Sequence, residues 1–167
     1  SNASTTLESG SGDAEEVLTG RGFLSQTDWA GGDGQELYED ETRYASADST
    51  IDTTSQPGDV RLVETFGSYA ESGVLTSSTF DTGSASNFHH LRWEPGDQPP
   101  AACEDSVRFQ IATSASSSPD TWEFRGPDGT TSSYYTTADT AFASVHDDDR
   151  YLRYKLFLAS ADENVTP

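Results

Sequence analysis

The sequence predicts an all-β protein, an antiparallel β-sandwich formed by a single domain. Apolar and polar residues alternate over short stretches, and turn-forming residues recur about every 8 to 12 residues, as in sandwich proteins. No stretch of about ten or more residues has the apolar repeat of a helix, with a period of about 3.6 residues. The length of 167 residues is close to that of one domain.

The clearest strand signals are two alternating runs, residues 107–112 and Arg150–Ala159. Successive side chains of a strand point to opposite faces, so each run has one apolar face. These faces comprise Val107, Phe109 and Ile111 in the first run, and Leu152, Tyr154, Leu156 and Leu158 in the second. We expect both faces to point into one core, with Arg108, Gln110 and Ala112 on a water-exposed face. The second run is long enough to be a central strand.

Shorter segments supply the remaining predicted strands. They are Val60–Phe66, Val74–Phe80, Phe88–Trp93, Trp122–Phe124 and a piece that begins at Tyr134. The turn Pro127-Asp128-Gly129-Thr130 separates the last two, since proline fixes φ, aspartate bonds its own backbone and glycine accepts positive φ. Seven or more strands therefore fit an antiparallel sandwich.

The N-terminal segment differs in amino-acid composition from the rest of the chain. Ser1-Asn2-Ala3 resembles the remnant of a cleaved affinity tag, and Ser4–Gly20 is rich in Ser, Gly, Asp and Glu. So few apolar residues cannot offset the entropy lost on folding. The sequence therefore predicts a tag remnant and flexible acidic tail over 1–20, and one β-sandwich domain over 21–167.

Several segments occur together in a familiar order. They are Leu75–Gly83, Leu91–Trp93, Ser106–Thr113, Gly126–Thr130 followed by Tyr134-Tyr135, and Arg150–Lys155. In this order they resemble a galactose-binding-like jelly-roll module of secreted bacterial proteins and of type IV pilin-like or pseudopilin surface proteins. The resemblance covers about Phe23 to Pro167. It implies a jelly-roll fold, and no residue matches a sugar-binding motif of the family.

The resemblance implies a non-catalytic extracellular interaction or structural module of a bacterial cell-surface or pilin-like protein. Other surface or pilus subunits would be its partners. The alternative is a carbohydrate-binding module of a secreted protein on the same scaffold, with glycans as ligands. Both place the chain outside the cell or on its surface.

The net charge of the chain excludes some classes of binding partner. The chain has 29 acidic and nine basic residues, and its net charge of −20 repels nucleic acid and anionic lipid. No apolar run reaches the roughly 18 residues that span a bilayer, so we expect no membrane contact. Such acidity is typical of proteins from salt-loving organisms, and an ordinary acidic secreted protein is the alternative.

Aromatic residues are the candidate binding groups. Trp29 lies in a glycine-rich loop, Trp122 begins a short strand, and Tyr134-Tyr135 must point to opposite faces of an extended segment. These four could offer flat apolar faces to a sugar or a protein. The alternative is a place in the core, which we expect for Trp93 and which competes with binding for Trp122.

Catalytic and metal motifs are not found in the sequence. It contains no Gly-x-Ser-x-Gly elbow, no His-Glu-x-x-His and no phosphate-binding glycine loop, so no catalytic residue is predicted. Asp147-Asp148-Asp149 offers oxygens of the kind that calcium takes, but without the EF-hand spacing, and a solvated turn is expected there. His89-His90 cannot chelate one ion together from a strand, and Cys103 is a lone, half-buried thiol. No cofactor, metal site or enzymatic activity is predicted.

Overall fold

The computed structural model describes residues 26, 29, 44–56 and 58–167, and these form an all-β structure with antiparallel strand pairing. The predicted all-β class is therefore confirmed. The predicted tail over 1–20 and the boundary at residue 21 lie outside the described residues. None of the described residues belongs to a helix long and apolar enough to cross a membrane.

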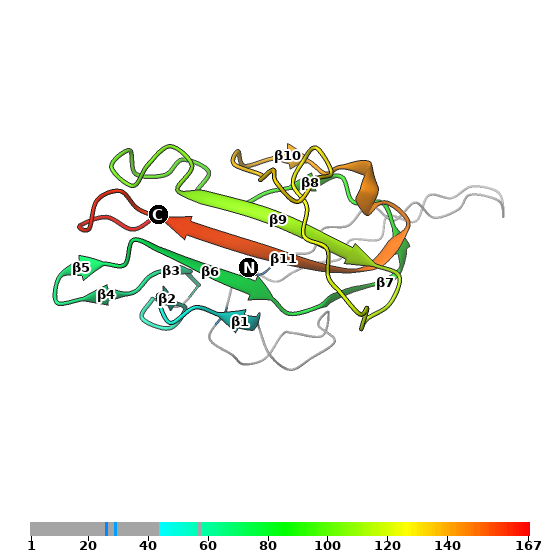
Figure 1. Cartoon of the computed structure of the whole chain (residues 1–167), viewed down its shortest axis with the longest axis horizontal. Helices are drawn as coiled ribbons and strands as arrows, with labels where there is room; N and C mark the ends of the chain where they lie inside the picture. The colour runs from blue at the N-terminus through cyan, green and yellow to red at the C-terminus, as the bar shows by residue number, and fades with distance from the viewer. Residues whose placement is uncertain (1–25, 27–28, 30–43, 57) are drawn as a thin grey trace, which may run out of the picture.

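The largest unit is a five-stranded sheet around β11 (Asp149–Ala159). β9 (Val107–Ser114) pairs with β11 in continuous register from Leu158↔Val107 to Tyr151↔Ser114. The other edge of β11 pairs with β7 (Phe80–Ser86) at its start and with β6 (Ser72–Ser77) towards its end, and β1 (Tyr44–Ala47) lies outside β6. β9 and β11 run side by side through the middle of the molecule (Figure 1). The prediction of a long central strand at Arg150–Ala159 is confirmed.

Short two-stranded ladders complete the described structure. They are β2 (Ile51–Asp52) with β3 (Arg61–Leu62), β4 (Glu64–Thr65) with β5 (Ser68–Tyr69), and β8 (His90–Leu91) with β10 (Thr140–Ala141). A single turn of 3-10 helix, η1 (Ser144–His146), precedes β11. The jelly-roll order of strands remains a prediction.

The core lies on the face of the sheet that the alternation predicted. All seven apolar residues expected from the two runs are buried, and Leu62, Leu75, Phe80 and Tyr135 pack with them. Phe109 contacts both Tyr154 and Trp93, with ring centroids 5.8 Å and 4.9 Å away. Burial of these side chains is the main stabilising contribution of the sheet.

The opposite face of β9 differs from its prediction. Gln110 and Ala112 are buried and Arg108 is half-buried, although a water-exposed face was expected. The chain after β9 returns along the free edge of that strand and pairs with it at two isolated bridges, Ile111↔Arg125 and Phe109↔Tyr135. Its side chains cover the outer face. Gln110 adapts to burial because its Nε2 donates to the carbonyls of Thr131 and Ser133, each at 2.9 Å.

Candidate functional site

Two of the four predicted aromatic residues come together on the outer face of the main sheet. Trp122 and Tyr134 both lie on the segment that returns along β9, and both are half-buried. Phe124, between them in sequence, shares their face because successive residues alternate. The outward side chains of β9 and β11 continue this surface.

Strand register places a cation opposite each of these rings. Arg153 pairs with Ala112, Lys155 with Gln110 and Phe157 with Arg108. The Arg153 guanidinium lies 4.9 Å from the Trp122 ring centroid, and Lys155 Nζ lies 4.3 Å from that of Phe124.

The third row uses β9 itself for its cation. The Arg108 guanidinium lies 4.8 Å from the Tyr134 ring centroid and 5.9 Å from that of Phe157, and these two rings meet edge to face at 5.2 Å. We call this set the outer ladder: Arg108, Trp122, Phe124, Tyr134, Arg153, Lys155 and Phe157. Its cations already occupy aromatic faces that a sugar ring would need.

The other two predicted aromatics lie elsewhere. Tyr135 is fully buried on the core face, and burial raises the pKa of its phenol, so the expectation of a surface anchor at Tyr135 is corrected. The bridge to Phe109 forces this orientation, since paired residues point to the same face. Trp29 is half-buried against the core, and its Nε1 donates to the Tyr154 hydroxyl at 2.8 Å. The four residues therefore do not form one site.

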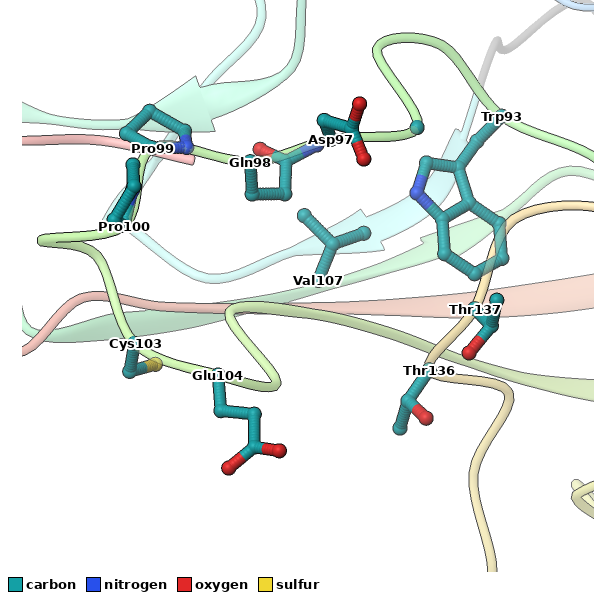
Figure 2. Close-up of a pocket in the computed structure, with 11 residues that line it drawn as sticks. Trp93, Asp97, Gln98, Pro99, Pro100, Cys103, Glu104, Val107, Thr136 and Thr137 are labelled. Atoms are coloured by element: carbon teal, nitrogen blue, oxygen red, sulfur yellow. The ribbon is translucent and has the colours of Figure 1, made fainter.

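A pocket of about 470 Å³ opens beside Trp93, a residue that the sequence assigned to the core. Its volume falls within the range of small-ligand sites, about 300 to 1,000 Å³. Trp93 and Thr137 lie on one side of it, and Pro99, Pro100 and Cys103 lie on the other (Figure 2). Val107 lies between the two sides in the same view. The pocket therefore combines an aromatic wall with an aliphatic residue of the core.

Polar groups line the rest of this Trp93 pocket. They include the exposed carboxylates of Asp97 and Glu104 and the exposed threonines Thr136 and Thr137. Two polar atoms of the lining residues are buried without a hydrogen-bond partner among the described residues: Trp93 Nε1, a donor, and Gln98 Oε1, an acceptor. Leaving such an atom unsatisfied costs about 1 to 3 kcal/mol. Both atoms are closed off from solvent, so a ligand hydroxyl would reach them only after the lining side chains move.

Sequence reasoning missed this pocket although one signal was present. Trp93 immediately precedes Glu94-Pro95-Gly96-Asp97, and Pro99-Pro100 follows shortly after. A proline-rich loop after a tryptophan holds the chain away from the ring instead of continuing the strand. The threonines opposite it come from a distant segment and could not be placed there from the sequence.

A second group of polar residues surrounds His146, which is buried. Thr113 Oγ1 donates to Asp149 Oδ2 at 2.7 Å and lies 3.1 Å from His146 Nδ1. The Thr113 hydroxyl has one hydrogen, and it donates that hydrogen to the Asp149 carboxylate. His146 Nδ1 must therefore carry the imidazole proton and donate to Thr113 Oγ1. Burial, with the positive charge of Arg125, lowers the pKa of His146. In a catalytic triad the hydroxyl instead donates to the histidine, so this group has the opposite polarity.

The described residues contain no cluster of three or more His, Cys, Asp or Glu side chains able to hold a metal ion. Asp147 and Asp148 are exposed at the turn before β11, while Asp149 accepts from Thr113. Cys103 is a half-buried free thiol, as expected, and its Sγ lies 3.7 Å from the Ala159 carbonyl oxygen.

No family model matches the chain, and no curated protein or solved structure is significantly similar to it.

Proposed function

We propose that this chain is a non-catalytic binding domain of an extracellular, surface-attached protein, and that it binds carbohydrate in the Trp93 pocket. The observation that carries this proposal is the composition of the pocket. An indole wall, two threonines, a glutamine and two carboxylates surround a space of about 470 Å³. Sugar rings present apolar C–H faces and many hydroxyls, and sites that hold them combine aromatic surface with convergent polar groups.

The unpartnered atoms of Trp93 and Gln98 favour a hydroxylated ligand over a purely apolar one. A hydroxyl is both donor and acceptor, so ligand hydroxyls would satisfy the indole N–H and the amide oxygen once a shift of the lining side chains exposes these atoms. Asp97 and Glu104 have no ion pair among the described residues. Their negative charge accepts hydrogen bonds from hydroxyls and repels carboxylated sugars. We therefore expect a neutral or amine-bearing sugar.

The test is titration of the protein with neutral oligosaccharides and with a uronic acid oligomer, followed by tryptophan fluorescence and calorimetry. We expect saturable binding of a neutral glycan, with a dissociation constant on the order of 1 mM, as is usual for one small contact. The double variant Thr136→Val, Thr137→Val should weaken it about tenfold. Trp93→Phe keeps an aromatic wall but removes the indole N–H, so it should weaken binding and abolish the fluorescence change.

The matched control is Thr65→Val, an exposed threonine on β4 that does not line the pocket. It should bind like the wild type. Binding that is unaffected by the threonine pair, or tighter binding of the uronic acid than of neutral glycans, would contradict the proposal. A thermal melt of each variant shows whether lost binding reflects lost folding.

A further inference from the structure

The outer ladder gathers positive charge in a chain that has little of it. Arg108, Arg153 and Lys155 are three of only nine basic residues in a chain with a net charge of −20, and Lys155 is its one lysine. All three lie on one face of β9 and β11, where strand register holds them in adjacent rows. The face is thus a local positive patch on an acidic molecule.

Two of these cations lack carboxylate partners. The ion pairs within the described part of the chain join Arg125 to Glu123 and Arg150 to Asp81, and neither involves Arg108 or Lys155. Arg108 Nε is also buried without a hydrogen-bond acceptor. Contact with a ring partly stabilises a cation but supplies no acceptor for its N–H groups. Arg108 and Lys155 are half-buried, so the ladder presents two partly exposed cations that have no carboxylate partner among the described residues.

We propose that the outer ladder is a subunit contact that receives the carboxylate-rich surface of a second copy of this chain. The argument is charge complementarity: a copy of the chain carries 29 acidic residues against nine basic ones, so a positive patch on one copy attracts the carboxylates of another. Aromatic and arginine side chains are also the residues most enriched at the centres of protein interfaces. Because the donor and acceptor surfaces differ, the contact is head to tail and extends into a chain of subunits unless it closes into a ring.

Ionic strength gives this contact a recognisable signature. Two copies that each carry −20 charges repel at long range, and salt of about 0.15 M screens that repulsion beyond roughly 8 Å. Carboxylates in direct contact with Lys155 and Arg108 are screened less. Self-association should therefore increase from about 0.01 M to about 0.15 M salt.

The experiment is sedimentation equilibrium of the intact chain over a range of protein concentrations at both salt levels. We expect self-association at the higher salt, reduced about tenfold by Lys155→Gln combined with Arg108→Gln. Arg92→Gln is the control for each single variant, Lys155→Gln and Arg108→Gln, because it also removes one positive charge but from an exposed side chain outside the ladder. The single variant Arg108→Lys keeps both positive charges of the ladder, so it should retain most of the association.

Three outcomes would overturn the proposal: a monomer at every concentration and salt, association that survives the double variant, or an equal loss in Arg92→Gln. Thermal melts separate loss of contact from loss of folding. Glycan binding at the Trp93 pocket is measured separately, so failure of either proposal leaves the other testable.

Discussion

The variant Tyr154→Phe, which removes one hydroxyl oxygen from the core, tests whether Gln26 and Trp29 dock there. Tyr154 is buried in β11, and its hydroxyl accepts from Trp29 Nε1 at 2.8 Å and donates to Gln26 Oε1. Tyr154→Phe keeps the ring and its contacts with Phe80 and Phe109, so only these hydrogen bonds are lost.

The expected cost follows from the two hydrogen bonds. Each contributes about 0.5 to 1.5 kcal/mol net, so we expect Tyr154→Phe to lower the free energy of unfolding by about 1 to 3 kcal/mol. Trp29 is half-buried, and water that reaches its N–H places the result toward the lower end of this range. A loss of about 2 kcal/mol corresponds to a fall in the thermal midpoint of about 4 to 8 °C for a chain of this size.

Urea denaturation followed by tryptophan fluorescence measures this cost. The midpoint should fall with an unchanged slope, because the surface exposed on unfolding is nearly the same. Tyr44→Phe is the control, since Tyr44 is half-buried against the same core and its hydroxyl has no hydrogen bond among the described residues. If the two variants differ by less than about 0.5 kcal/mol, the docking of Trp29 and Gln26 on Tyr154 contributes nothing to stability.

Three further predictions concern charge and packing. The thermal midpoint should rise between low salt and about 1 M potassium chloride, because screening relieves the self-repulsion of −20 charges. A midpoint that does not rise would contradict this. Since burial lowers the folded-state pKa of His146, the unfolded chain binds its proton first. Stability from this group is therefore complete above about pH 6.5 and falls as the pH decreases below it, and denaturation at several pH values should show a flatter profile for His146→Gln. Gly126→Ala places Cβ 2.3 Å from the Ser133 carbonyl carbon and should cost about 1 to 3 kcal/mol in urea denaturation, whereas the exposed Thr131→Ala should cost under about 0.5 kcal/mol.

The core could be predicted from the sequence because it depends on alternation within single strands. In 107–112 and in Arg150–Ala159, the residue spacing alone decides which side chains share a face. The structure buries all seven apolar residues that the alternation assigns to the core face of the two runs. Pairing between the two runs does not follow from the alternation, because two strands of opposite sheets can also point into one core.

The outer face could not be predicted in the same way. Whether Gln110 meets water depends on where residues 122–135 go after β9, and these lie beyond a turn and a serine-rich stretch. Polar residues on one face of a strand normally indicate solvent. Here the Gln110 amide finds two backbone carbonyls of the returning segment, and this compensation exists only once that segment is in place.

Strand register, rather than amino-acid composition, brings the residues of the outer ladder together. Arg108, Phe124 and Lys155 are ordinary strand residues, and they meet because β9 pairs with β11 on one edge and with the returning segment on the other. A shift of one residue in the β9 and β11 pairing would turn every cation of β11 to the core face, where an unpaired charge is far too costly. Burial of Leu152, Tyr154 and Leu156 therefore also fixes the cations outward, beside the aromatic rings. In a chain with so few basic residues, the apolar pattern of one strand concentrates positive charge on one surface, and this is why a strongly acidic protein can present a local contact for carboxylates.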